Sequence, residues 1–248
     1  MSGINPQNTA MLLSHGAWHA PHHYSQLIEG LEKEGYTVVA PQLPSVGRDG
    51  DAWDDDVNTL RSELQNIFKS GKDAAIIMHS YGGVCGSEAA KGFVKGEGGN
   101  THGVVKLIYM CAFALPTSTS LNGALSGLPP LDWIDPTPSG KALTCERNDD
   151  IFYNDISDAA WKKQTSSELK PHAADTMAAE VTWEPYRQIS SAYLLCERDM
   201  AIPIQAQEGM AEAAGITEVR RIDASHSPWV SRTGETVRAV LDAFAGKL

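Results

Sequence analysis

The chain has 248 residues, of which 42% are hydrophobic and 21% charged, and its formal net charge is −11. This length suits one large α/β domain with a substantial core. The negative charge argues against nucleic acid and anionic membranes as partners, and no apolar run approaches the roughly 18 residues of a membrane span. Four scattered cysteines and an N-terminus without a basic signal region lead us to expect a cytoplasmic protein with free thiols.

Short apolar runs alternate with amphipathic segments at the start of the chain. Residues 9–14 predict a strand that ends before a His-Gly pair. Pro21 stands where a first helical turn would begin, and apolar residues at helical spacing follow it until Gly35. Residues 36–40 predict a second strand, which two prolines close.

The alternation continues through the middle of the chain. Several aspartates between residues 51 and 56 precede an amphipathic segment. Acidic groups stabilise the first turn of a helix, so we interpret them as a helix N-terminus rather than as a metal site. We expect an apolar strand at residues 74–78, a helix of small residues at 82–94 and a buried strand at 104–112.

Prolines and aromatic residues interrupt this rhythm between residues 115 and 187. Short helices are expected there at residues 157–165 and 171–180. An insertion of this length between two core strands predicts a helical lid over the carboxyl edge of the sheet, where ligands bind in open α/β sheets. The predicted domains are therefore a core of residues 1–114 and 188–248 and a lid of residues 115–187.

The last quarter of the chain returns to the alternating pattern. Strands are predicted at residues 192–196 and 216–222, and helices at 203–214 and 233–244. The complete order predicts an α/β fold with a mainly parallel sheet of about six strands and helices on both faces.

A serine stands at the abrupt joint between a predicted strand and a predicted helix. The segment Met78-His79-Ser80-Tyr81-Gly82 matches the G-x-S-x-G nucleophile elbow, except that Met78 replaces the first glycine. Such a turn exposes the serine hydroxyl and aims the next N–H group at the oxygen that becomes negative. Ser80 could instead merely cap the helix, but its position directly after a strand favours a nucleophile.

The elbow predicts an acid and then a histidine later in the chain. Asp199 and His226 each lie just past a predicted strand, and His226 is the only histidine after Asp199. Glu197 and Asp223 are alternative acids close to these positions. Asp149 lies in a similar local sequence but falls within the insertion. We rank Asp199 first, because a strand end places it at the same sheet edge as the serine.

The His-Gly pair after the first strand suits an oxyanion site. Gly16 lets the backbone approach a substrate, so the N–H of Ala17 would complement the N–H of Tyr81. Four histidines lie between positions 15 and 23 and raise the alternative of zinc. The predicted helix begins after the first two of them and no acidic residue lies among them, so we expect no metal and no cofactor.

Several segments together are similar to a known family. HGAWHAPHHYSQLIEGLEKEGYTVVAPQLPSVG, HSYGG, LLCERDMAIP and SHSPW resemble the α/β-hydrolase superfamily, in particular its short branch of plant-type methylesterases and hydroxynitrile lyases with fungal or bacterial relatives. The resemblance covers nearly the whole chain except the lid. It implies Ser80 as nucleophile, His226 as base and Asp199 as the group that orients it. Ala17 and Tyr81 would supply the oxyanion N–H groups.

Further residues near these groups are candidates for contact with a substrate. Tryptophans of the lid would line an apolar pocket, although any one of them could be ordinary core. The expected substrate-binding residues are His15, Gly16, Trp18, His79, Trp133, Trp161 and Trp183.

These features predict a serine hydrolase that cleaves a small to medium carboxylic ester, thioester or lactone. Lyases of the resembled branch carry a threonine and a lysine where this chain has Gly16 and Ser227, and the lysine would stabilise a departing anion. The alternatives are a lyase or cyclase that uses the same residues as acid and base, and a non-catalytic binding protein. We expect a small-molecule substrate, and the sequence leaves the oligomeric state open, a homodimer included.

Overall fold

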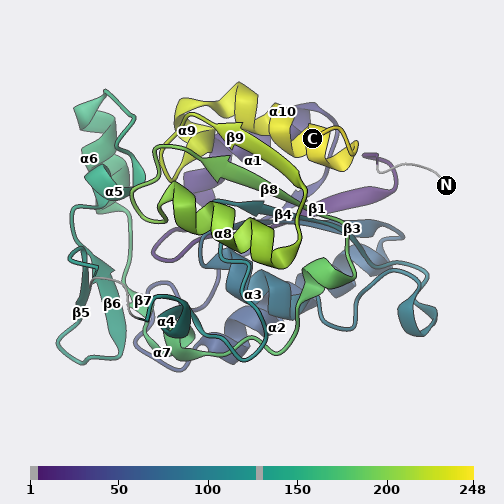
Figure 1. Ribbon diagram of the computed structural model, residues 1–248, viewed down its shortest axis with the longest axis horizontal. Helices are drawn as coiled ribbons and strands as arrows, with labels where there is room; N and C mark the ends of the chain where they lie inside the picture. The colour runs from purple at the N-terminus through teal and green to yellow at the C-terminus, as the bar shows by residue number, and fades with distance from the viewer. Residues whose placement is uncertain (1–4, 127–130) are drawn as a thin grey trace.

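A six-stranded parallel sheet forms the centre of the molecule (Figure 1). The structure, a computed structural model, describes residues 5–126 and 131–248. The strand order is β2-β1-β3-β4-β8-β9, and every neighbouring pair is parallel. The predicted fold class is confirmed. The strands are β1 (Thr9–Ser14), β2 (Val38–Val39), β3 (Asp73–His79), β4 (Val104–Met110), β8 (Ser191–Cys196) and β9 (Glu218–Ile222).

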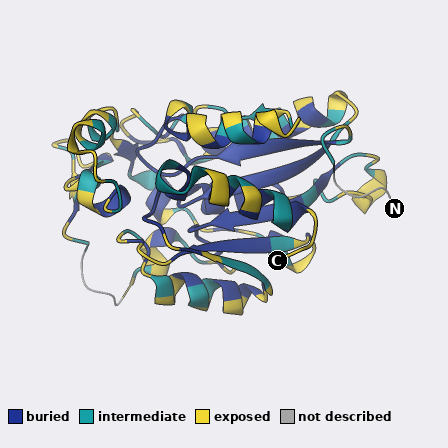
Figure 2. Cartoon of the chain, turned by 90° about the horizontal axis from the view of Figure 1, so that it is seen from above, coloured by how far each residue is buried: buried dark blue, intermediate teal, exposed yellow. Residues whose placement is uncertain are grey.

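Helices cover both faces of this sheet, and each face has its own hydrophobic core. On β1, Met11 and Leu13 point into one core and Ala10 and Leu12 into the other, as the pleat of a strand requires. Figure 2 shows the buried strands between helices whose outer faces are exposed. The first core is covered by α1 (Ser25–Lys33), α9 (Pro228–Ser231) and α10 (Thr233–Phe244), and the second by α2 (Trp53–Lys69), α3 (Gly82–Ala89) and α8 (Ile204–Ala214).

Several elements are shorter than the sequence predicts. Helix α3 ends at Ala89 instead of residue 94, because the chain turns at Gly92, which has a φ of +76°. Strand β4 ends at Met110, since Cys111 has a φ of +37°, and β2 spans two residues only. Asp54, Asp55 and Asp56 form the first turn of α2, as predicted, whereas Asp51 precedes the helix.

The segment between β4 and β8 mixes helices with strands, whereas the sequence predicts helices. Prolines limit the length of helices in this segment, and the helix expected at residues 171–180 is replaced by β7 and a single turn of α7. The helices are α4 (Leu121–Ala124), α5 (Asn148–Phe152), α6 (Ala159–Ser167) and α7 (Asp175–Ala178). The strands β5 (Ile134–Pro136), β6 (Ala142–Cys145) and β7 (His172–Ala173) form an antiparallel sheet. The role of this segment as a lid stays a prediction.

Crossing a bilayer takes a long apolar helix, and none occurs in the part of the chain that the structure describes.

Candidate active site

Ser80 lies on a strained turn between β3 and α3. Its φ is +54°, a region that residues other than glycine rarely adopt. The turn leaves no room for side chains beside the serine: a Cβ on Gly82 would lie 2.1 Å from the Ser14 carbonyl oxygen, and one on Gly83 would lie 2.4 Å from the Phe113 carbonyl oxygen. The backbone geometry is that of the predicted elbow.

The departure from the elbow motif at Met78 is accommodated by Gly86, a glycine in the middle of α3. Met78 is fully buried, and a Cβ on Gly86 would come within 2.9 Å of its sulfur atom. Gly86 therefore provides the space on α3 that a methionine beneath the turn requires.

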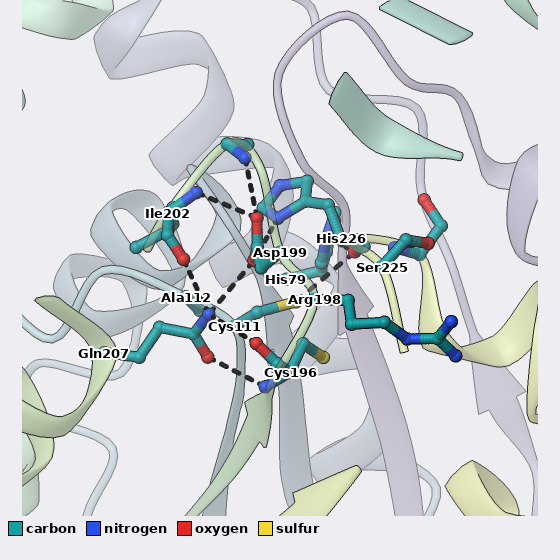
Figure 3. Close-up of polar contacts among 12 residues, drawn as sticks. His79, Cys111, Ala112, Cys196, Arg198, Asp199, Ile202, Gln207, Ser225 and His226 are labelled. Atoms are coloured by element: carbon teal, nitrogen blue, oxygen red, sulfur yellow. Dashed lines mark hydrogen bonds and ion pairs between the residues drawn. The ribbon is translucent and has the colours of Figure 1, made fainter. Parts of the chain in front are cut away.

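Asp199 and His226 form a buried pair at the carboxyl ends of β8 and β9 (Figure 3). Oδ2 of Asp199 lies 2.7 Å from Nδ1 of His226, and both side chains are almost completely buried. Oδ1 of Asp199 accepts hydrogen bonds from the N–H groups of Ala201 and Ile202, each at 2.8 Å. The side chain of Gln207 on α8 donates to Oδ2 at 3.1 Å. These donors hold the carboxylate against the imidazole.

The alternative acids face other partners. Glu197 is exposed and pairs with Arg221, with a separation of 3.4 Å, and Asp223 pairs with Arg198 at 2.7 Å. Asp149 lies in the first turn of α5. The geometry therefore favours Asp199 as the partner of His226.

His79, the residue before the serine, connects three loops of the site through buried hydrogen bonds. The N–H of Gly16 donates to the hydroxyl oxygen of Tyr24 at 2.9 Å, and that hydroxyl lies 2.7 Å from Nδ1 of His79. Nε2 of His79 lies 2.9 Å from the backbone oxygen of His226. The path thus runs from the loop before Ala17, through the elbow, to the loop that carries the candidate base.

The hydrogen-bond partners of His79 determine which of its two ring nitrogens carries the proton. The carbonyl oxygen of His226 only accepts, so Nε2 of His79 carries a proton and Nδ1 accepts one from the Tyr24 hydroxyl. Burial lowers the pKa of His79 well below its usual value, so the ring is neutral and has a single N–H. The two rings of His79 and His226 are 4.5 Å apart. In the described part of the chain no hydrogen bond joins the Ser80 hydroxyl to His226, and such bonds often form only with substrate bound.

Removing the Tyr24 hydroxyl should impair turnover more than substrate affinity. In Tyr24→Phe the N–H of Gly16 and Nδ1 of His79 lose their common partner. We expect kcat to fall roughly ten- to a hundredfold with little change in KM, because small displacements of reacting groups have effects of this size. Tyr109→Phe is the control, since Tyr109 is equally buried but bonds to Ser87. Equal losses of kcat in both variants would show a general packing effect instead.

The two predicted oxyanion residues lie beside the serine. Ala17 and Tyr81 line the same small cavity as Ser80. The hydroxyl of Tyr81 donates to the buried carboxylate of Asp56 at 2.8 Å, and its ring packs edge-on against His172. Asp56 thus anchors the residue after the serine, in addition to its place in the first turn of α2.

The cavity at Ser80 is small and apolar, and a larger groove adjoins it. The cavity has a volume of about 40 Å³ and the groove about 650 Å³. Both are lined by residues of the inserted segment and of the loop before α8. The shared residues are Phe113, Leu125, Leu131, Trp133, Ala201 and Ile202.

The predicted substrate contacts are divided between this cavity and other places. Trp18 and Trp133 line the cavity, with ring centroids 5.8 Å apart. His15 does not line it, since Nε2 accepts from the N–H of Leu43 and Nδ1 donates to the carbonyl oxygen of Gly16. Gly16 leaves room for the His79 ring, because a Cβ at this position would lie 2.7 Å from Nδ1 of His79.

The other two tryptophans among the predicted substrate contacts, Trp161 and Trp183, do not line the cavity at Ser80. Trp161 packs edge-on against Tyr153 and lines a separate polar cavity. Trp183 packs against the hydrophobic core. Prolines and short helices give this segment no regular periodicity, so the sequence does not show which of its aromatic residues face the site.

Residues that could hold a metal at the candidate site already have partners. His79, Cys111 and His226 bring possible ligand atoms within 4.8 Å of one another. Both ring nitrogens of His79 are hydrogen bonded, and Asp199 occupies Nδ1 of His226. The arrangement suits proton transfer between side chains better than metal binding.

Four buried histidines should make the stability sensitive to acid. Burial lowers the pKa of His15 to about 4 and of His172 to about 3, and it lowers the pKa values of His19 and His79 strongly. In the unfolded chain these groups titrate near 6.5, so the stabilisation is complete above pH 6.5 and is lost as the pH falls towards the folded values. For each histidine the free energy of unfolding falls by at most about 1.4 kcal/mol per pH unit within this interval.

Urea denaturation at a series of pH values tests this expectation. The midpoint should fall steadily between pH 6.5 and 4.5. A midpoint that is constant over this interval would contradict neutral burial of these rings.

Comparisons with known proteins agree with the geometry. Residues 11–240 match the sequence profile of the alpha/beta hydrolase family. The chain is 32% identical over 246 residues to alpha/beta hydrolase nvfD of Aspergillus novofumigatus, covering 94% of this chain and 96% of that protein. It is 24% identical over 255 residues to methylesterase 7 of Arabidopsis thaliana, covering 93% and 94%.

A solved structure extends the comparison to three dimensions. The pyrethroid hydrolase PytH superposes with a TM-score of 0.79 at 21% identity, covering 96% of this chain and 98% of that one. The relatives named as hydrolases and esterases support a hydrolase, and the methylesterase agrees with the branch that the motifs resemble. The chain therefore belongs to the alpha/beta hydrolase family.

Proposed function

We propose that the protein is a serine esterase that cleaves an apolar carboxylic ester, thioester or lactone through an acyl-enzyme at Ser80. The observation that carries this proposal is the buried contact of 2.7 Å between Asp199 and His226 at the sheet edge where the strained turn of Ser80 also lies. A serine hydroxyl is a weak nucleophile at neutral pH, and this set supplies a base and a group that orients the base.

The reaction would proceed in two halves. Nδ1–H of His226 donates to Asp199, so Nε2 keeps a lone pair and takes the proton of Ser80 as its oxygen attacks the carbonyl carbon. The N–H groups of Ala17 and Tyr81 stabilise the negative oxygen. His226 then passes its proton to the leaving group, and the ester bond breaks. In the second half His226 takes a proton from a water molecule whose oxygen attacks the acyl carbon, and it returns that proton to the Ser80 oxygen as the acyl bond breaks and the acid leaves.

The cavities support a substrate with a small reacting end and a larger apolar part. A volume of about 40 Å³ at Ser80 is far below the roughly 300–1,000 Å³ of ligand pockets, whereas the groove of about 650 Å³ falls within that range. We therefore propose that the ester group reacts beside Ser80 and that an apolar chain or ring lies in the groove.

Filling the groove should select against long substrates. Ala206 is exposed on α8 and lines the groove, whereas its neighbour Gln205 is exposed on the same helix and does not line it. We expect Ala206→Leu to lower kcat/KM for a long-chain p-nitrophenyl ester about tenfold relative to the acetate. Gln205→Leu should leave that ratio unchanged. Equal ratios in both variants would place the apolar part of the substrate elsewhere.

A panel of substrates with a covalent probe tests the proposed function. Esters, lactones and cyanohydrins are assayed before and after treatment with a fluorophosphonate. We expect ester or lactone turnover that the probe abolishes in proportion to labelling. Cleavage of cyanohydrins without ester turnover would indicate a lyase, and saturable binding with no turnover would indicate a binding protein. The uncharged Ser227 directly after His226 gives no support to cyanide release.

A further inference from the structure

Two histidines and a glutamate form a second cluster of polar side chains, outside the candidate active site. His22 and His23 lie on the short helix Pro21–Tyr24, and Glu168 directly follows α6 of the inserted segment. Nε2 of His22 is 3.1 Å from Oε2 of Glu168, and one possible ligand atom from each of the three residues lies within 4.8 Å of the others. The three side chains line a polar cavity of about 210 Å³.

His23 has an unmet hydrogen-bonding need at this cavity. It is only 9% exposed, and among the described residues its Nε2 has no hydrogen-bond partner. The main chain of Thr165 lies near the ring but forms no hydrogen bond of normal geometry with Nε2. Nδ1 lies 3.2 Å from the carbonyl oxygen of Ala20. When Nδ1–H donates there, Nε2 carries a free lone pair, which is how metal-binding histidines are usually held.

The opposite tautomer of His23 also leaves Nε2 without a hydrogen-bond partner among the described residues. Nδ1 can accept from the N–H of Ala20 at 2.9 Å, but Nε2 would then be a buried donor without an acceptor. A cation bound to Nε2 of His23 would satisfy this nitrogen in the tautomer that carries its proton on Nδ1.

We propose that His22, His23 and Glu168 bind a transition-metal ion, with Zn²⁺ as the preferred ion. Two imidazoles and a carboxylate form an established zinc donor set, and with metal–ligand distances near 2.0–2.1 Å tetrahedral ligands lie about 3.3 Å apart. The present separation of 3.1 Å between His22 and Glu168 is close to that spacing. The cavity leaves room for water as the remaining ligand.

The site would join two parts of the chain that lie 146 residues apart in sequence. His22 and His23 belong to the core, and Glu168 follows α6. A bound ion would therefore fasten α6 to the core. The histidine pair alone is visible in the sequence, whereas Glu168 joins it only through the fold.

Zinc binding to tag-free, EDTA-treated protein tests the proposal. Titration calorimetry with ZnCl₂ and thermal melting are measured on the wild type, Glu168→Gln, His22→Gln and the control His102→Gln. His102 is a partly exposed histidine near a carboxylate, 3.5 Å from Asp73, and does not belong to the cluster. We expect one ion to bind the wild type and His102→Gln and to raise their melting temperatures. Both cluster variants should bind at least about tenfold more weakly.

Binding of Co²⁺ supplies an independent readout. The wild type and His102→Gln should give the visible absorption of four-coordinate Co²⁺, and the cluster variants should not. Zinc affinity that is the same in all four proteins would place the ion elsewhere and overturn the proposal, as would the absence of stoichiometric binding. Neither readout depends on ester hydrolysis, so failure here leaves the proposed function unaffected.

Discussion

Replacing Ser80 by alanine should lower kcat for an activated ester roughly a millionfold, because loss of the nucleophile in a comparable set of residues has that effect. The side chain is 8% exposed and lines the cavity beside Ala17 and Tyr81. Its removal takes away the attacking oxygen but leaves the turn and its glycines intact. The measurement is steady-state hydrolysis of a p-nitrophenyl ester by purified protein.

Ser87→Ala is the matched control for this experiment. Ser87 is also buried and lies on the helix that follows the turn; it bonds to the hydroxyl of Tyr109 and weakly to the sulfur of Met78, and to none of Ser80, Asp199 and His226. Ser87→Ala should lower the melting temperature somewhat and leave kcat within about threefold of the wild type. The substitution leaves the hydrogen bonds of the reacting side chains unchanged. A Ser80→Ala protein with more than a small fraction of wild-type activity would exclude the acyl-enzyme route.

The second large effect is expected from Asp199→Asn, with a fall in kcat of about 10⁴-fold. The amide oxygen can keep the bonds from the N–H groups of Ala201 and Ile202. The amide nitrogen then faces His226, where it donates to Nδ1 and forces the proton onto Nε2. An imidazole in that tautomer cannot accept the proton of the serine.

Glu197→Gln tests whether the correct acid has been identified. Glu197 lies two residues before Asp199 and pairs at the surface with Arg221. Its substitution should change kcat less than about twofold, because exposed pairs contribute little. A mild effect of Asp199→Asn together with a severe effect of Glu197→Gln would reverse the assignment.

The parts of the site that follow strand ends could be predicted from the sequence. A buried parallel strand is recognisable as a continuous apolar run, and the residue after it must lie at the carboxyl edge of the sheet. Ser80 and Asp199 each follow such a run, whereas His226 follows the edge strand β9, which is largely charged and is predicted from its place in the alternating pattern. Their order along the chain and the topology of the sheet bring them to one edge without detailed knowledge of side-chain packing.

The supporting residues could not be predicted in this way, since their roles depend on contacts between distant segments. Tyr24 fits the apolar face of a helix, yet its hydroxyl bonds to His79, 55 residues away. Asp56 belongs to an acidic helix start and also anchors Tyr81. Gln207 is one polar residue on an ordinary helix until the fold places it against Asp199. No local pattern distinguishes these residues from their neighbours.

The inserted segment illustrates a different difficulty. Its prolines exclude long helices, but they do not specify which short segments pair as strands. Strand β6 pairs with β7, which begins 27 residues after β6 ends, through only two residue pairs. Contacts so short and so far apart leave no periodic signal in the sequence.

The most direct test of the central claim is to identify the residue that a fluorophosphonate modifies. Labelled protein is digested and its peptides are analysed by mass spectrometry, with His226→Ala as a variant that lacks the base. We predict a single adduct on Ser80, formed in step with the loss of esterase activity and much more slowly in the variant. Esterase activity that persists in fully labelled protein, or a label on another residue that accounts for the inactivation, would contradict the proposed role of Ser80.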